Sequence, residues 1–160
     1  MTQGTKRMVL ALIGVAIIAM TTRAESMKPV KEEMMIARGT FEVKMTPRPE
    51  ESAGGSFGQF FIDKKFQGDL DGVSNGHMLA SGGPPSKSGA YVALEQVTGM
   101  LNGKHGSFVL MHRGTMNDGA AHLDVAVVPG SGTGDLKGIA GTMTIIIEGG
   151  KHSYEFSYVL

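Results

Sequence analysis

Residues 89–116 read GAYVALEQVTGMLNGKHGSFVLMHRGTM, and they contain the clearest turn signal in the chain. Asn102-Gly103 at its centre is typical of a two-residue type I′ turn, which joins antiparallel strands. With these two residues as the turn, one face of the hairpin pairs Val97 with Phe108, Glu95 with Leu110 and Ala93 with His112. We expect this face to line the interior, although it carries a carboxylate and an imidazole as diagonal neighbours.

A second glycine turn predicts a further hairpin near the C-terminus. With Gly149-Gly150 as the turn, the inward pairs are Ile147 with His152, Ile145 with Tyr154, and Met143 with Phe156. Before it, Leu123, Val125 and Val127 alternate with His122, Asp124 and Ala126. This alternation predicts a strand with His122 on its outer face.

Similar runs recur every 10 to 15 residues between glycine, proline and Asn-Gly signals, which is the spacing of a sandwich or barrel. We predict eight strands, near residues 38–46, 57–66, 69–80, 89–98, 106–115, 122–128, 139–148 and 151–159. The segments 46–56 and 81–88 contain prolines and paired glycines and are expected to be loops. The fold class is therefore all-β, a single small antiparallel barrel that closes its own edges. A barrel of this size is either filled by side chains or holds one small ligand.

The N-terminus has the pattern of a secretory signal peptide. Lys6-Arg7 precede an apolar core, Met8 to Met20, of 13 residues, which is shorter than the roughly 20 residues that span a bilayer. Cleavage is expected after Ala24. We therefore predict a signal peptide over residues 1–24, a lead-in segment over 25–36 and the barrel domain over 37–160, with export to the periplasm or the medium.

Two alternatives to export with cleavage stay open. An uncleaved leader would anchor the chain, and this is the only membrane contact that the sequence predicts. A true start at Met27, Met34 or Met35 would instead give a cytoplasmic protein with the same domain.

Composition excludes several classes of function. Fifteen basic residues balance fifteen acidic ones without a basic cluster, so we expect no nucleic-acid partner. Cysteine is absent, which excludes disulfides and thiolate chemistry. The Gly130–Gly134 run lacks the lysine of a phosphate-binding loop. The G-x-S-x-G motif of serine hydrolases does not occur. We expect no cofactor. The acidic and histidine residues lack the spacing of a metal site: Asp69, Asp71, His77, His122 and Asp124.

Glu95 and His112 are the candidate functional pair. A carboxylate and an imidazole that share a desolvated site tune each other's pKa and can serve as general acid and base. The same pair also fits two simpler roles, an internal salt link or the polar lining of a ligand cavity. With their neighbours they form the predicted ligand-binding set: Tyr91, Glu95, Phe108, Leu110, His112, Tyr154 and Phe156.

Several runs in a fixed order resemble the bacterial family called domain of unknown function 3224. They are GTFEVKMT (39–46), FQGDLDG (66–72), GAYVALEQVTG (89–99), GSFVLMHRGTM (106–116), VVPGSGTGDL (127–136) and GGKHSYEF (149–156). The resemblance covers residues 37 to 160 and implies a barrel of the allene oxide cyclase type. It supplies no established activity, because a fold does not transfer chemistry.

These observations predict an exported barrel that binds a small, largely apolar ligand in its interior, with Glu95 and His112 fixing the orientation of the ligand. The first alternative is an isomerase or cyclase that uses the same pair to move a proton on an apolar substrate. The second is a closed-core interaction module that works through its surface. The sequence does not decide between binding and catalysis, and it does not predict an oligomeric state.

Overall fold

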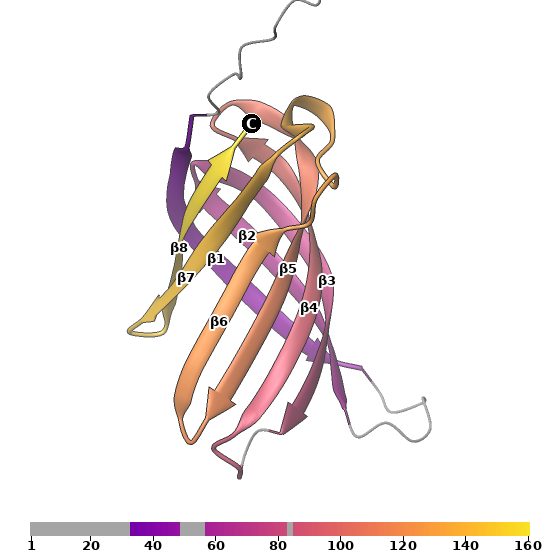
Figure 1. The fold of residues 1–160 in the computed structure, drawn as a ribbon, viewed down its shortest axis with the longest axis vertical. Coiled ribbons are helices and arrows are strands. Elements are labelled where there is room, and N and C mark those ends of the chain that lie inside the picture. The colour runs from indigo at the N-terminus through magenta and orange to yellow at the C-terminus, as the bar shows by residue number, and fades with distance from the viewer. Residues whose placement is uncertain (1–32, 49–56, 83–84) are drawn as a thin grey trace, which may run out of the picture. The chain divides into compact units, whose positions relative to one another are not determined.

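The structure is a computed structural model that describes residues 33–48, 57–82 and 85–160. The chain folds into eight antiparallel strands (Figure 1): β1 (Met35–Pro47), β2 (Gly58–Gly68), β3 (Leu70–Gly82), β4 (Gly89–Leu101), β5 (Lys104–Asn117), β6 (Ala120–Val127), β7 (Ala140–Glu148) and β8 (Lys151–Val159). The short 3-10 turn η1 (Gly134–Leu136) precedes β7. The predicted all-β class and strand number are confirmed. The predicted leader and residues 25–32 of the lead-in lie outside the described residues.

Each strand pairs with its neighbour in sequence, and β1 also pairs with β8, so the sheet closes into a barrel. The closing seam runs from Met35 opposite Tyr158 to Phe41 opposite His152. On the other side of the β7–β8 hairpin, β6 and β7 pair only at Ala126 and Thr142. The hairpin is short and ends part of the way along the barrel (Figure 1). The wall is therefore complete at one end of the barrel and less complete at the other.

The hairpin registers predicted from the two turns are confirmed, but Ile147, which was expected on the inward face, is 63% exposed beside the β7–β8 turn. Val97 lies opposite Phe108 and Ala93 opposite His112 across β4 and β5, and Ile145 lies opposite Tyr154 across β7 and β8. Asn102 has a φ of 47° and Gly103 a φ of 81°, which is the left-handed backbone that a type I′ turn requires. Because a two-residue turn has no further loop residues, β4 and β5 continue up to the turn and are longer than predicted.

β1 begins at Met35 rather than near residue 38. Its first residues alternate only weakly in hydropathy, but pairing with β8 satisfies their backbone groups. Closure of the barrel thus sets this boundary, and no local pattern marks it.

One end of the barrel is packed shut. The connection between β6 and β7 carries η1 over this end, where Leu136 and Ile139 are buried. Two tyrosine hydroxyls tie strands to turns at the same end: the Leu70 amide donates to Tyr154 Oη at 2.9 Å, and Asn102 Nδ2 donates to Tyr158 Oη at 2.9 Å. We call this the closed end.

The opposite end, where the β3–β4 and β5–β6 connections lie, is called the mouth. Buried apolar side chains form two separate clusters along the barrel. The larger one fills the closed end and includes Phe66, Phe108 and Phe156. The smaller one, Ile62, Met78 and Ala93, lies toward the mouth and contacts Tyr91. Among the described residues, no helix has the length and hydropathy needed to cross a bilayer.

Candidate functional site

A buried polar cluster separates the two apolar clusters, with Glu95 of β4 at its centre. Glu95 is fully buried. Lys64 Nζ from β2 donates to Glu95 Oε2 at 2.7 Å, and Ser74 Oγ from β3 donates to Glu95 Oε1. His112 Nε2 from β5 lies 2.9 Å from Oε2. Four adjacent strands thus contribute one side chain each, and we call this set the polar layer.

Burial alone raises the pKa of Glu95, because a charged carboxylate is poorly solvated in the interior. The close contact with His112, the charge and hydrogen bond of Lys64, and the Ser74 hydroxyl act in the opposite direction and lower the pKa to about 2. Glu95 is therefore ionised at neutral pH. Its carboxylate is held by partners within the protein.

His112 is as buried as Glu95 in practice, with 4% of its surface exposed. Its Nε2 atom is close to the carboxylate, but it is not aligned for a hydrogen bond with any described residue. A buried ring nitrogen without an aligned partner is costly unless something else satisfies it. The predicted Glu95–His112 contact exists, and His112 is its incompletely satisfied member.

The sequence prediction missed Lys64 and Ser74. Lys64 is 8% exposed, and its ammonium lies 4.9 Å from the centre of the Phe41 ring and 5.8 Å from that of Phe66, where the aromatic faces attract a cation. Alternation along β2 would have found Lys64, since it shares the inward face with Phe60, Ile62 and Phe66. No comparable signal marks Ser74.

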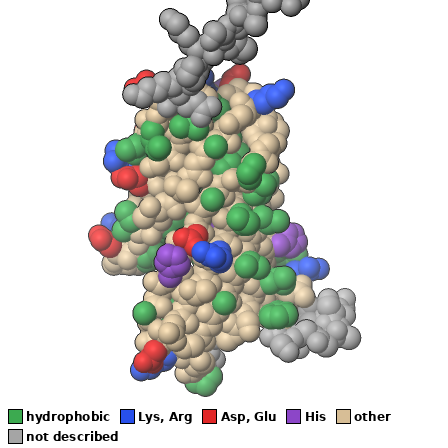
Figure 2. Space-filling view, viewed as in Figure 1, with side chains coloured by type: hydrophobic (Ala, Val, Ile, Leu, Met, Phe, Trp, Pro, Cys, Tyr) green, Lys and Arg blue, Asp and Glu red, His purple; other side chains and the backbone are tan. Residues whose placement is uncertain are grey.

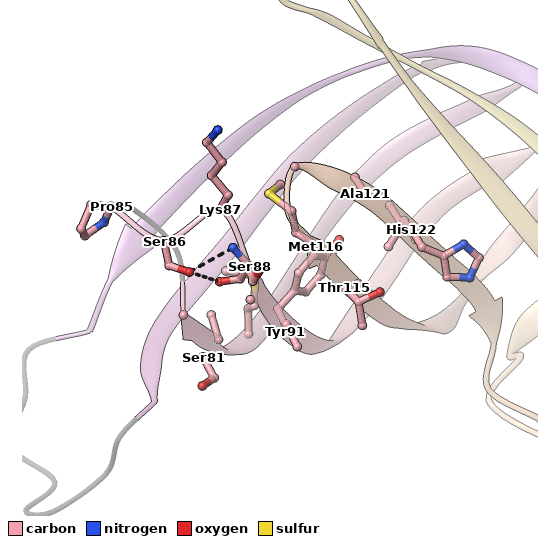
Figure 3. Close-up of a pocket in the computed structure, with 18 residues that line it drawn as sticks. Ser81, Pro85, Ser86, Lys87, Ser88, Tyr91, Thr115, Met116, Ala121 and His122 are labelled. Atoms are coloured by element: carbon pink, nitrogen blue, oxygen red, sulfur yellow. Dashed lines mark hydrogen bonds between the residues drawn. The ribbon is translucent and has the colours of Figure 1, made fainter.

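A cavity of about 630 Å³ occupies the mouth of the barrel. Residues of β3 to β6, of the β3–β4 connection and of the β5–β6 turn line it (Figure 3). The inward lining is largely apolar: Met78, Ala80, Tyr91, Gly114 and Leu123. A cavity of this size is within the range of small-molecule sites.

Tyr91 is the aromatic residue of this lining, and it depends on Gly114 across the β4–β5 ladder. A Cβ atom at Gly114 would lie 2.1 Å from the Tyr91 ring, so the ring lies flat over the glycine. Burial, and secondarily the Glu95 charge, raise the pKa of the Tyr91 hydroxyl. The hydroxyl thus stays protonated and available as a hydrogen-bond donor.

The remaining predicted ligand-binding residues lie in the closed end. The structure buries all four in the larger apolar cluster, where they pack against one another and their neighbours: Phe108, Leu110, Tyr154 and Phe156. Phe108 and Phe156 stack with ring centres 5.6 Å apart. Of the predicted set, Tyr91 lines the mouth cavity, and Glu95 and His112 lie in the polar layer.

Outside the barrel, Asp124 accepts hydrogen bonds from Arg113, and His122 Nε2 lies 3.2 Å from Asp124 Oδ1. Arg113 and His122 are largely exposed, as predicted for His122, and the Asp124 side chain is about half exposed. Within the described ranges, no three histidine, aspartate or glutamate side chains are grouped in a way that would hold a metal ion.

Comparison with known proteins finds a similar solved structure and a matching family. A crystal structure of a protein of unknown function from the DUF3224 family of Shewanella oneidensis MR-1 is similar, with 47% sequence identity and a TM-score of 0.72. The match covers 79% of this chain and 96% of that one. No curated protein matches the chain. The profile of DUF3224, a family of proteins of unknown function, matches residues 37–158, and the chain belongs to this family.

Proposed function

We propose that this protein binds a small, largely apolar ligand in the mouth of its barrel. The observation that carries the proposal is the cavity of about 630 Å³ at the end that side chains do not fill. A barrel that served only as a scaffold would gain stability from filling this space, since unfilled apolar volume is destabilising.

The polar groups near the cavity support a ligand with one polar end. Tyr91 offers a protonated hydroxyl in the lining, and His112 has a buried ring nitrogen without an aligned partner. The Glu95 carboxylate is occupied by Lys64 and Ser74. Glu95 therefore holds its neighbours in place. In this proposal Tyr91 contacts the ligand in the cavity lining, and His112, which is not part of the lining and has its Nε2 atom 2.9 Å from Glu95 Oε2, fixes a polar end of the ligand that reaches the polar layer.

A neutral apolar fluorophore, N-phenyl-1-naphthylamine, tests the cavity directly. We expect saturable binding at one site per chain. Replacing Ala80 with Phe places a ring inside the cavity and should weaken binding roughly tenfold or more, since several apolar contacts are lost. The matched control is Ala120→Phe, which adds the same ring at an exposed position at the start of β6.

Equal affinity in both variants would place the fluorophore outside the barrel and contradict the proposal. Absence of any saturable binding by the folded wild-type protein would also contradict it. Mass spectrometry of material extracted from natively purified protein then identifies the chemical class of a natural ligand.

Glu95→Gln tests the role of the polar layer, because it keeps the shape of the side chain and removes its charge. If Glu95 orients His112 toward the ligand, affinity per folded molecule should fall. Unchanged affinity in folded Glu95→Gln protein would limit Glu95 to a structural role.

The buried His112–Glu95 contact of 2.9 Å also favours a second candidate, an isomerase or cyclase that moves a proton on an apolar substrate. Here His112 would exchange the proton and Glu95 would stabilise its charged form. The two candidates differ in one observable. An enzyme converts the extracted compound on incubation with fresh protein and loses this activity in His112→Gln, whereas a binding protein returns the compound unchanged.

Export belongs to the same proposal. The Lys6-Arg7 pair, the apolar stretch behind it and Ala24 support cleavage by a signal peptidase. Loss of Lys6, Arg7 and Arg23 would leave twelve basic and fifteen acidic residues, a net charge of −3. Fractionation of cells followed by intact-mass measurement should find a chain starting at Glu25 outside the cytoplasm. Full-length protein confined to the cytosol would contradict export.

A further inference from the structure

Tyr91 presents a hydrogen-bond donor to the mouth cavity. Burial and the charge of Glu95 raise the pKa of its hydroxyl, so the hydroxyl keeps its hydrogen. A phenol donates more readily than it accepts, because the lone pair of its oxygen is delocalised into the ring. The hydroxyls of Tyr154 and Tyr158 have hydrogen-bond partners within the chain. Among the described residues, the Tyr91 hydroxyl has no such partner, so its hydrogen is available to a ligand.

His112 provides a second donor beside the cavity. The ladder places it in the same row as Met78, which lines the cavity, because Met78 pairs with Ala93 and Ala93 with His112. His112 Nε2 lies 2.9 Å from Glu95 Oε2. Since a carboxylate oxygen only accepts, a nitrogen at this distance carries a hydrogen. This hydrogen is not aligned with the carboxylate, and it is therefore able to bond a second acceptor.

The interior has no unpaired positive charge for an acidic ligand. Of the described lysine and arginine side chains, only Lys64 is buried, and its ammonium already lies 2.7 Å from Glu95 Oε2. Any charge on His112 faces the same carboxylate. An anionic ligand group that reached the polar layer would therefore be buried without a partner, which is strongly unfavourable.

The cations at the rim of the cavity do not change this balance. Lys87 and His122 belong to the lining, but both are exposed, and Figure 3 shows them extending away from Tyr91. Water and salt screen charges in such positions. On the face that Figure 2 displays, positive and negative side chains are interspersed without a positive cluster. This surface therefore does not attract anions to the barrel.

We propose that the ligand of the mouth cavity is a neutral compound with a hydrogen-bond acceptor, such as the carbonyl oxygen of a ketone or an ester, on an apolar body. This inference rests on the proposed function, because it names the chemical class of ligand for the same cavity. The acceptor bonds the Tyr91 hydroxyl, and the apolar body contacts Met78, Ala80 and Leu123. A pure hydrocarbon would leave the hydroxyl without a partner once it displaced water.

Three naphthalenes of nearly the same shape test the class of ligand. 2-Acetylnaphthalene carries a neutral carbonyl, 2-naphthoate carries a carboxylate, and 2-isopropylnaphthalene has no polar group. Each competes with N-phenyl-1-naphthylamine for the full chain at neutral pH, and displacement of the fluorophore gives the Kd of the competitor. We expect 2-naphthoate to bind at least about tenfold more weakly than 2-acetylnaphthalene, because its charge would be buried without a partner.

Tyr91→Phe removes the donor and keeps the ring that lies over Gly114. It should weaken the binding of 2-acetylnaphthalene about fivefold, the usual effect of losing one hydrogen bond between neutral groups. It should not weaken the binding of 2-isopropylnaphthalene. The matched control is Tyr158→Phe, which removes the same hydroxyl group at the closed end and should leave all three Kd values unchanged. Circular dichroism checks that both variants keep the strand signal of the wild type.

Two results would overturn the class of ligand while the cavity itself stands, because the fluorophore still binds in both. One is a Tyr91→Phe variant that binds 2-acetylnaphthalene as tightly as the wild type does, or that weakens it and 2-isopropylnaphthalene equally. The other is 2-naphthoate that competes as well as 2-acetylnaphthalene. If the folded wild-type protein does not bind the fluorophore, the proposed function fails and this inference fails with it.

Discussion

At the scale of single residues, removing one charge from the polar layer is expected to lower the stability of the protein strongly. Lys64 and Glu95 are both almost fully buried, and each is compensated by the other. Leaving one of them without its partner in the interior is far more destabilising than breaking an exposed pair.

Lys64→Met should therefore lower the free energy of unfolding by about 3–5 kcal/mol. The control Arg38→Met breaks the exposed Arg38–Glu155 pair, whose atoms are 2.8 Å apart, and should cost no more than about 1 kcal/mol. Urea denaturation measures both. The double variant Lys64→Met/Glu95→Leu should regain much of the loss, because it removes the isolated charge. Similar losses in Lys64→Met and Arg38→Met would contradict a buried, mutually dependent pair.

The lowered pKa of Glu95 predicts that the free energy of unfolding depends on pH. Its pKa is about 2 in the folded protein and 4.5 in the unfolded reference, so unfolding takes up a proton between these values. The stabilisation is complete above about pH 5 and is lost as the pH falls toward 2, by on the order of 3 kcal/mol. Urea denaturation across this range should show the loss in wild-type protein and a smaller slope in Glu95→Gln. Equal slopes would show that other carboxyl groups cause it.

At the scale of the strand, neighbouring strands differ in length, and this difference determines which strand edges are hydrogen-bonded. The first part of β6 pairs with β5, but its other edge has one described pair, at Ala126. β4, in contrast, is paired on both sides along its whole length.

Hydrogen exchange should separate the two strands. Alternate amides between Ala120 and Asp124 should exchange with solvent much faster than the amides of β4, because each points to a side without a described strand partner. Nuclear magnetic resonance of the exchanging protein gives the rate at each residue. Equal protection along β6 and β4 would show that another segment pairs with the β6 edge.

Much of the strand pairing could be predicted from the sequence, since a two-residue glycine turn fixes the register of the two strands that it joins. Asn102-Gly103 predicted every pair between Ala93 and His112, and with them the Glu95–His112 neighbourhood. The sequence could not predict that Phe108 and Phe156 would fill one end while Tyr91 lines a cavity at the other. That difference depends on how far around the barrel each hairpin reaches, which is a property of the closed sheet.

Lys64 and Ser74 escaped prediction for a related reason. Glu95 is brought to them by pairings across β2, β3 and β4, and no short turn with a fixed register joins β3 to β4. The sequence likewise could not predict the contact between Tyr91 and Gly114, because it depends on how closely the tyrosine ring approaches the glycine backbone.

At the scale of the whole molecule, the two apolar clusters share every strand from β2 to β4. Although the polar layer separates them, neither end can lose its strands while the other keeps its sheet. Residues 31–160 should therefore unfold in one transition. Tyrosine signals from the closed end and the far-ultraviolet dichroism should give the same denaturation midpoint. Separate midpoints would show that the mouth melts first.

The seam between β1 and β8 has a consequence for redesign of the chain. Met35 lies directly opposite Tyr158, so a short linker joins the ends of the domain without crossing the mouth. New termini can then be opened at Gly149-Gly150, a turn in which both residues have positive φ and no long-range pairing is lost. Such a circular permutant would keep the cavity intact and make β8 the first strand of the chain.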